Sequence, residues 1–461
     1  MEKSSVLKDP KASEVSKKET FSFGLGYAAL NLGQIGIFGY LTFFWSDIAL
    51  IPLAAISMIY LIPRLWDWAD DIFVGYLVDL THTKYGKARP WLLWSLFPTL
   101  ITLILLFYVP DISTNFKIIY AFVIYSLVNL FYLTAFQIPM QTLDVLITND
   151  RNTRLSLNMF GQLFGTATYA IASFFVPMGI AFFGGGEQGY FYIFGLLSVI
   201  TAICIFITFK GVKERTNENI DQPDKKDRLK IKEAVIMLIT NKYWLINTLL
   251  QFTSWLVPSF MAVSLYYVTW IMKEPNLQGT FMSTMMVAGL VMLLICTPFV
   301  KKIGKSITAY SAMMLQFVGA LVTLINPASV ALLLVSASLR GAGSSVMLGT
   351  RLAFTSDAVE YGEWKTGKRT EGLIFSATSI GQRLGQGIGG ALVTWILATG
   401  GYVGGAEAQT ASAISAINLL FTWLCAIGSL GAIICLMIMQ RLDKKMPIIM
   451  ADLEERRRLN Q

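Results

Sequence analysis

The sequence has few charged residues and almost no histidine. Of its 461 residues, 14% are charged and 54% are hydrophobic, and His82 is the single histidine. The mean hydropathy is +0.57. A soluble globular chain of this length carries more charge, so these figures indicate an integral membrane protein. One loop histidine cannot serve a Ser-His-Asp triad or an intramembrane proton relay, and phosphate-cradle and zinc motifs are missing, so we expect no enzyme.

Cysteine is also scarce. The four cysteines lie in apolar runs without metal-ligand spacing, which favours buried thiols over a disulfide framework: Cys204, Cys296, Cys425 and Cys435. Residues 1–21 form a polar, Lys-rich tail without an apolar signal-peptide core, so we expect no cleavage and a tail that stays inside the cell.

What the sequence does have is long apolar runs. Twelve of them are long enough to span about 30 Å of hydrocarbon as helices. The expected spans are 22–46, 54–79, 90–109, 117–147, 156–183, 190–210, 244–271, 279–300, 306–326, 329–357, 372–398 and 414–440. The sequence therefore predicts an all-α membrane protein with twelve transmembrane helices.

The basic residues give this arrangement an orientation. With a cytoplasmic N-terminus, the segments on the inner side hold 31 of the 37 lysines and arginines. Basic residues concentrate on the cytoplasmic side of membrane proteins. We therefore expect a multi-pass protein of the cell membrane with both termini cytoplasmic. The same distribution argues against nucleic acid as the reason for the formal charge of +8.

A polar stretch in the middle of the chain separates two sets of six spans. It predicts an N-terminal bundle over 22–210, a cytoplasmic linker over 211–243, a C-terminal bundle over 244–440 and a cytoplasmic tail over 441–461. Two bundles joined in this way place a substrate site between them near the middle of the membrane.

Four charged residues interrupt the second span, in RLWDWADDIFVGYLVDLTHTKYGKARPW. A charge near the middle of a spanning helix costs about 2.5 to 3.5 kcal/mol, so such residues usually face a polar cavity. At 100° per residue, Arg64, Asp67 and Asp71 share one face and Asp70 lies beside it. Three carboxylates outnumber one arginine. We therefore predict a cation site at Asp67 and Asp71, against the alternative of a structural ion pair.

The surplus of acids in the second span needs a basic partner or a bound cation. Arg383 in SATSIGQRLGQGIGG on the eleventh span is the predicted partner, which a cation would displace, or else it lines the cavity without touching the acids. Neighbouring carboxylates raise a pKa and a facing arginine lowers it, so sodium and proton both stay open as the coupling ion. We expect no other cofactor.

Amides are unusually common in the first six spans. Asn31 and Gln34 lie on span one, Gln137 and Gln141 on span four, and Asn158 and Gln162 on span five. The last two pairs have i, i+4 spacing, so each shares a helix face. Amides both donate and accept hydrogen bonds, which suits a ligand rich in hydroxyls. They also act as contacts between membrane helices, worth only about 0.6 kcal/mol each.

Aromatic residues and two further arginines are weaker candidates. Trp45, Tyr266, Tyr267 and Trp270 either stack on a sugar ring or belong to the interfacial aromatic belt. Arg340 and Arg351 lie within about 20° of one another around span ten. They either bind an anionic group of the substrate or pair with acids such as Asp357.

The loops after spans two and ten place acids near bases. They contain Asp79, Lys87 and Arg89 in the first loop and Asp357, Glu360 and Arg369 in the second. Such residues either form salt bridges of an inner gate or simply anchor the topology.

These motifs together resemble a known family. The stretch RLWDWADDIFVGYLVDLTHTKYGKARPW, Ile138-Pro139 in span four, and SDAVEYGEWKTGKRTEGLIFSATSIGQR resemble the glycoside-pentoside-hexuronide:cation symporters of the major facilitator superfamily, typified by the melibiose permease. The resemblance implies cation-site roles for Asp67, Asp71 and Thr134, with Arg383 at the position of a lysine. It implies a sugar, a cation and the bilayer as partners, and we expect a monomer.

The expected sugar site departs from that family's pattern. Asn31 and Gln137 stand where the permease has acids, Gln141 where it has a tryptophan, and Gln162 where it has an arginine. With those acids gone and Arg340 present, our hypothesis is a pentoside or an acidic sugar such as a glucuronide. A lipid transporter on the same scaffold and a non-transporting sugar sensor are the rival functions.

Overall fold

The computed structural model describes residues 15–64, 67–148, 150–215, 231–367 and 371–459. The first part of the chain is called the N half here. Its helices are α1 (Lys17–Gly39), α2 (Leu41–Phe43), the π-helical η2 (Phe44–Ile48), α3 (Leu53–Arg64), α4 (Asp67–Leu80), α5 (Arg89–Leu106), α6 (Thr114–Val128), the π-helical η3 (Asn129–Phe136), α7 (Gln137–Leu146), α8 (Arg151–Phe182) and α9 (Gly186–Gly211).

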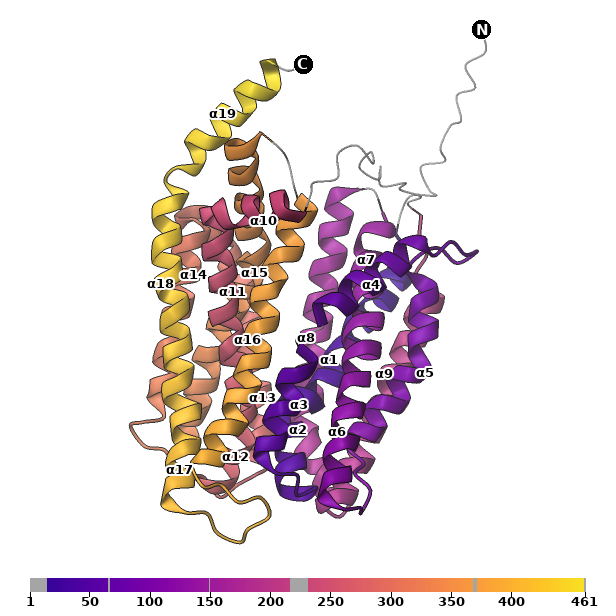
Figure 1. Ribbon diagram of the computed structural model, residues 1–461, viewed down its shortest axis with the longest axis vertical. Helices are drawn as coiled ribbons and strands as arrows, with labels where there is room; N and C mark the ends of the chain where they lie inside the picture. The colour runs from indigo at the N-terminus through magenta and orange to yellow at the C-terminus, as the bar shows by residue number, and fades with distance from the viewer. Residues whose placement is uncertain (1–14, 65–66, 149, 216–230, 368–370, 460–461) are drawn as a thin grey trace.

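The remaining helices make up the C half. They are α10 (Ile231–Thr240), α11 (Lys242–Phe260), the 3₁₀ turn η5 (Met261–Val263), α12 (Ser264–Trp270), α13 (Leu277–Ile303), α14 (Lys305–Val322), α15 (Val330–Thr366), α16 (Glu371–Thr399), α17 (Ala411–Asn418), the π-helical η6 (Leu419–Leu424), α18 (Cys425–Asp443) and α19 (Met446–Leu459). Figure 1 shows the two halves side by side, with α19 at the top and the α12 and α17 region at the bottom.

Several helices begin at side chains that cap them. Ser16 accepts a hydrogen bond from the backbone of Glu19 at the start of α1, and Asp150 accepts one from Thr153 at the start of α8. Asn241 does the same for α11. Each cap satisfies a backbone N–H that has no partner within its helix. Polar residues that end the apolar runs thus fix where these helices start.

Nine helical stretches of the described residues are long and apolar enough to cross a membrane. The expected spans 54–79, 306–326 and 372–398 are not among the nine, although α3 and α4, α14 and α16 make them helical. In the first of these the apolar part is the short stretch Leu53–Pro63, because aspartates begin at Asp67. An all-helical membrane protein is therefore confirmed.

Two helices lie in segments that we expected to be a linker and a tail. The helix α10 occupies the end of the expected linker, and α19 occupies most of the expected tail. Leu453 of α19 is buried, and the indole of Trp364 on α15 donates a hydrogen bond to Asp452 on α19 (2.5 Å). A search for long apolar runs misses both, because α10 has only 10 residues and α19 is polar.

Two helix pairs join the halves along their length. The helix α3 packs against α16, and α8 packs against α13. Ser57 and Thr394 share a buried 2.6 Å hydrogen bond across the first pair, and Ser173 and Ser283 share one of 3.3 Å across the second. Small hydroxyl residues let membrane helices approach closely and bond across the contact.

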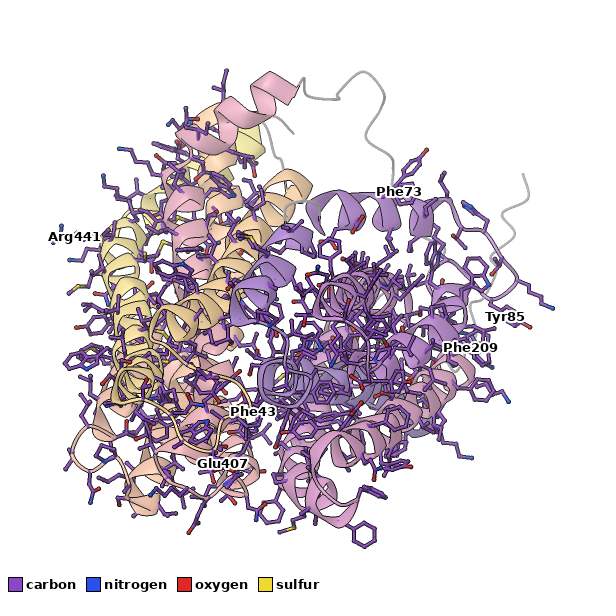
Figure 2. All side chains as sticks on the ribbon, turned by 60° about the horizontal axis from the view of Figure 1, so that its bottom comes forward. Phe43, Phe73, Tyr85, Phe209, Glu407 and Arg441 are labelled. Carbon is purple, nitrogen blue, oxygen red and sulfur yellow. The ribbon has the colours of Figure 1, made fainter. Side chains whose placement is uncertain are left out.

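The two ends of the molecule are named here by the position of the chain ends. The tail end is the end at which α1 begins and α19 lies, and the far end is the opposite one, where α12 and α17 lie (Figure 1). Figure 2 brings the far end forward and labels Phe43 of the N half and Glu407 of the C half at the seam between them. Phe43 packs edge-on against Tyr266, so the halves touch at this end.

Candidate functional site

A charged contact joins the two halves inside the apolar region. The guanidinium of Arg383 on α16 forms a salt bridge with Asp71 on α4, and these side chains are 22% and 23% exposed. Thr134 in η3 donates a 3.3 Å hydrogen bond to the same carboxylate. The packing of α3 on α16 brings Arg383 to the second expected span. Arginine stays charged in proteins and therefore holds its carboxylate partner ionised.

The other acids of the predicted cation site are less fully described. Asp70 is half-buried and takes part in an interaction within the protein. The side chains of Asp67 and Arg64 lie outside the described part of the structure. Asp71, Thr134 and Arg383 therefore form the described core of the candidate cation site.

A cluster of three polar residues connects α1, α7 and α8 nearer the tail end. The hydroxyl of Tyr27 donates a 3.0 Å hydrogen bond to Asp144 Oδ2, and the amide of Asn158 donates to the same oxygen. The Asn158 amide also donates to the Tyr27 hydroxyl (3.2 Å). Because these side chains meet, the helix faces that carry them converge. Asp144 was not among the predicted site residues, although it lies at i+7 from Gln137 and so on the same face.

The predicted sugar-site amides lie on these converging faces. The side-chain amide of Asn31 donates to the Tyr27 carbonyl one turn earlier (2.9 Å). Gln141 is exposed, and the side chains of Gln34, Gln137 and Gln162 are half-buried. Tyr27, Asn31 and Gln34 follow i, i+4, i+7 spacing on α1, which places them on one face. The structure thus brings the amides toward a common region.

Two glycines allow α1 and α8 to pack closely enough for this arrangement. A Cβ on Gly161 would lie 2.6 Å from the ring of Tyr27, and one on Gly165 would lie 2.5 Å from the amide nitrogen of Asn31. Both distances are shorter than van der Waals contact, so only glycine fits. The spacing Gly-x-x-x-Gly is typical of closely packed membrane helices.

A second polar network closes the far end. Tyr402, in the loop before α17, donates a 2.6 Å hydrogen bond to Asp47 Oδ1 at the end of η2. Ser46 donates to the other carboxylate oxygen (2.5 Å) and shares a 2.6 Å hydrogen bond with Tyr266. The indole of Trp270 donates to the Tyr402 hydroxyl (2.7 Å). Trp270 therefore extends this network within the C half, and its predicted role in sugar binding stays a prediction.

Asp47 lies beyond the end of the expected span 22–46. Burial raises the pKa of Asp47, and the hydrogen bonds from Ser46, Tyr402 and Gly405 oppose that rise. The loop backbone lies so close that a Cβ on Gly404 would lie 1.9 Å from the Ser46 carbonyl oxygen. Residue spacing in the sequence could not predict this network, because Asp47 and Tyr402 are 355 residues apart.

Arg340 is not placed to bind substrate. Its side chain is 1% exposed inside the C half, where its NH2 group donates to the Phe421 carbonyl (2.9 Å) and its guanidinium lies 4.3 Å from the Phe421 ring centroid. It pairs with no acid among the described residues, and its burial leaves it no access to a substrate in this conformation. Arg351 donates to Gln382 on α16 (2.8 Å), beside Arg383.

The predicted aromatic stacking residues are buried as well. Trp45, Tyr266 and Tyr267 have exposed fractions of at most 1%. Trp45 stacks on Tyr60, and Tyr267 stacks on Phe421. They are packing residues of the two halves in this conformation.

The predicted gating residues of the first loop bond within the N half. The backbone N–H groups of Lys87 and Arg89 donate to the carboxylate of Glu214 (2.8 Å each). The Arg89 guanidinium donates to the Phe209 carbonyl (2.7 Å). The side chain of Asp79 lies outside the described part of the structure.

In the second loop, the predicted gating residue Asp357 also bonds within its own half. Asp357 forms a salt bridge with Lys305, which also belongs to the C half, and Glu360 is half-buried on α15. Arg369 lies outside the described residues. The described contacts of Lys87, Arg89 and Asp357 therefore stay within one half, whereas the network of Asp47 and Tyr402 joins the two halves at the far end.

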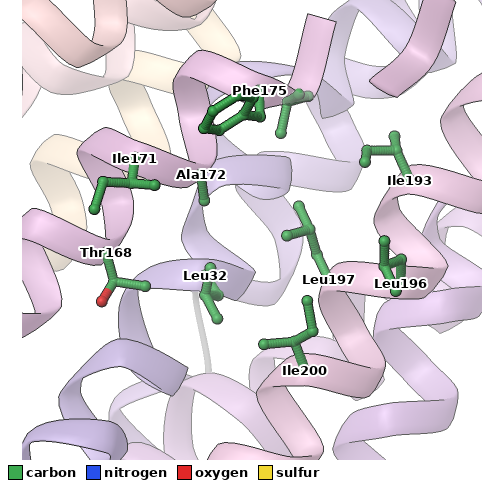
Figure 3. Close-up of a pocket in the computed structure, with 10 residues that line it drawn as sticks. Leu32, Thr168, Ile171, Ala172, Phe175, Ile193, Leu196, Leu197 and Ile200 are labelled. Carbon is green, nitrogen blue, oxygen red and sulfur yellow. The ribbon is translucent and has the colours of Figure 1, made fainter. Parts of the chain in front are cut away.

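A hollow of about 350 Å³ opens elsewhere, between α1, α8 and α9 (Figure 3). Leu32, Ile171, Phe175 and Leu197 line it, and Thr168 brings the one hydroxyl group. A sugar needs many hydrogen-bond partners, so this apolar hollow is not the sugar site.

Known proteins match nearly the whole chain. The family model described as MFS/sugar transport protein matches residues 22–444. The chain is 32% identical over 446 residues to the isoprimeverose transporter of Lactiplantibacillus pentosus, covering 95% of this chain and 91% of that relative. It is 30% identical over 421 residues to the inner membrane symporter YicJ of Escherichia coli (strain K12), covering 90% of each chain.

Solved structures share the fold. The crystal structure of a D-xylose-proton symporter superposes with a TM-score of 0.61 at 13% identity, covering 90% of this chain and 96% of that one. The family model spans far more than half of the chain and agrees with the helical architecture. The protein therefore belongs to the MFS/sugar transport protein family and is a membrane transporter, not an enzyme.

Proposed function

We propose that this protein is a cation-coupled sugar importer that works by alternating access. The chain crosses the cell membrane twelve times as a monomer, with both termini in the cytoplasm and two six-helix bundles over 22–210 and 244–440. The family and the relatives named as an isoprimeverose transporter and an inner membrane symporter support this function. With this orientation, the tail end faces the cytoplasm and the far end faces outward.

The observation that carries the proposal is the Arg383–Asp71 salt bridge between the halves. A cation that binds Asp67, Asp71 and Thr134 competes with the guanidinium for the carboxylate. Its binding breaks one link between the bundles and makes another conformation more favourable. A ligand shifts such an equilibrium only by its difference in affinity for the two states.

The sugar completes the coupling. Asn31, Gln34, Gln137, Gln141 and Gln162 supply its hydrogen bonds, because these amides lie on converging faces of α1, α7 and α8. Coupling requires the cation and the sugar to prefer the same conformation, and the linkage between them is reciprocal. With Arg340 buried in the C half, we propose a neutral glycoside or pentoside rather than an acidic sugar.

Transport in proteoliposomes tests this function. Labelled isoprimeverose is offered while the sodium and proton gradients are varied independently. We expect one gradient to drive accumulation, and we expect Asp71→Asn to abolish accumulation while counterflow continues. Glu187→Gln, an exposed acid at the start of α9, is the matched control. Undiminished accumulation by the Asp71 variant would remove the cation-site assignment.

A further inference from the structure

The helices α1, α7 and α8 each carry a row of polar residues on one face, called a ladder here. The three rows meet at Asp144. On α7, Gln137, Gln141 and Asp144 follow i, i+4, i+7 spacing and share one face. Tyr27 begins the ladder of α1, and Asn158 begins that of α8. The hydrogen bonds among Tyr27, Asp144 and Asn158 fix the end of all three ladders that lies toward the tail end.

Only one of the two carboxylate oxygens of Asp144 accepts hydrogen bonds from the described residues. Its Oδ2 accepts the hydrogen bonds of Tyr27 and Asn158. Its Oδ1 is buried and has no hydrogen-bond partner among the described residues. An ionised carboxylate accepts on both oxygens, and a buried acceptor without a partner is unfavourable. Oδ1 therefore has unused capacity to accept a hydrogen bond.

Neighbouring helices supply no salt bridge to Asp144 in the described part of the chain. On α8, Arg154 donates to the Thr148 carbonyl (3.1 Å). On α5, Arg89 donates to the Phe209 carbonyl. The direct hydrogen-bond donors to Asp144 are thus the neutral groups of Tyr27 and Asn158, and the charge of Arg154 acts on the carboxylate without a salt bridge.

The length of the α7 ladder indicates the size of the ligand. Gln137 and Asp144 are seven residues apart, which is about 10 Å along the helix axis. That distance accommodates two linked sugar rings rather than one. Gln141 in the middle of this face is exposed, so a ligand reaches the face within one turn of Asp144.

We propose that Asp144 is a substrate-binding residue, whose Oδ1 accepts a hydrogen bond from a hydroxyl on the second ring of a neutral two-ring glycoside. Tyr27 and Asn158 are positioning residues that hold the carboxylate. The first ring lies between Gln137 and the other amides. This inference rests on the proposed sugar transport and extends it to a residue and a substrate class.

The test compares a two-ring sugar with a one-ring sugar. Counterflow in proteoliposomes uses isoprimeverose and D-xylose as probes, with Asp144→Asn and Asp144→Ala as variants. We expect the apparent affinity for isoprimeverose to fall tenfold or more in both variants, while the maximal rate at saturation stays within twofold. The affinity for D-xylose changes less than twofold, because it binds at the Gln137 end. A purely structural role would lower the maximal rate and affect both sugars alike.

Two further variants separate the roles. Asp150→Asn changes an exposed acid six residues along the chain that caps α8, and Asn is an equally good cap, so the kinetics should match wild type. Tyr27→Phe keeps the carboxylate and should weaken isoprimeverose binding less than Asp144→Asn does. If Asp144→Ala fails to fold, the isosteric Asp144→Asn carries the test.

Each outcome decides between the two proposals. Wild-type affinity in Asp144→Asn, or equal losses for both sugars, would overturn the role of Asp144 and leave sugar transport intact. If the wild type moves neither probe, the proposed substrate class fails together with this inference.

Discussion

The hydroxyl of Tyr402 donates a 2.6 Å hydrogen bond to Asp47, and this bond ties a loop of the C half to the end of the first membrane helix of the N half. Ser46, Tyr266 and Trp270 extend the bond into a network. At the tail end, the predicted gating residues that the structure describes bond within their own halves. The conformation is therefore closed at the far end.

Removing the Tyr402 hydroxyl should loosen the far end. Hydrogen bonds to charged groups contribute about 1.5–3 kcal/mol, so Tyr402→Phe should raise the ratio of open to closed molecules roughly tenfold or more. Spin labels at cysteines introduced at Asp111 and Glu407, both exposed, measure the separation of the halves. The native cysteines are buried and should not be labelled. Tyr192→Phe, on a half-exposed tyrosine of α9, is the control, and identical distance distributions in both variants would contradict the prediction.

Closure of the far end should depend on pH through Asp47. Burial raises the pKa of this carboxyl in the closed state, whereas in an open state it regains the ordinary value of about 3.9. The closed state therefore binds the proton more tightly. Protonation of Asp47 therefore stabilises the closed state, and this stabilisation is complete below the open-state pKa. It is lost as the pH rises through the closed-state pKa.

The same label pair measures this effect. The closed fraction should increase as the pH falls, and Asp47→Asn should remove most of the change. A pH response that persists in Asp47→Asn would assign it to another group.

The salt bridge between Asp71 and Arg383 should contribute to stability as well as to coupling. Asp71→Asn deprives a partly buried guanidinium of this carboxylate and should lower the free energy of unfolding by about 1–3 kcal/mol, below the 3–5 kcal/mol of a fully buried pair. The double variant Asp71→Asn/Arg383→Gln should regain much of that loss without regaining accumulation. Thermal unfolding in detergent and uptake in vesicles measure the two quantities. Restored accumulation in the double variant would contradict a cation site at Asp71.

Arg340 should affect folding rather than substrate choice. Arg340→Lys keeps the charge but cannot reproduce the bonds to the Phe421 carbonyl and its neighbours, so we expect a loss of about 2–4 kcal/mol. Arg340→Met should be milder, because an apolar residue of similar size replaces a buried charge at little net cost. Uptake of neutral and acidic sugars should fall in proportion to the amount of folded protein. A selective loss of acidic sugar uptake would instead place Arg340 in the substrate site.

The apolar runs and the positions of charges predicted much of this molecule. In the described residues, each expected span is largely helical, and the predicted contact between Arg383 and an acid of the second span is present at Asp71. Such features are visible because a charge in an apolar run is unfavourable and needs a partner. The match of Thr134 to that carboxylate rested on family resemblance and agrees with its hydrogen bond.

The surroundings of other charged residues could not be predicted from helical periodicity. They depend on how far along the helix a residue lies and on contacts with segments distant in the sequence. Arg340 and Arg351 share a helix face, but eleven residues separate them by about 16 Å along the axis. One is enclosed by the C half, while the other reaches α16. Asp47 and Asp144 lie near the ends of their spans, where an acid is unremarkable until Tyr402 and Tyr27 are seen to bond to it.

The enclosed guanidinium of Arg340 has a consequence for biosynthesis. A charged helix enters the bilayer at a cost of about 2.5–3.5 kcal/mol, yet the acceptor of its shortest bond, Phe421, is made 81 residues later. The nascent chain must therefore carry α15 through insertion before that acceptor emerges from the ribosome. Chains that stop before residue 421 should be recognised as defective and degraded, whereas chains that include α18 should survive.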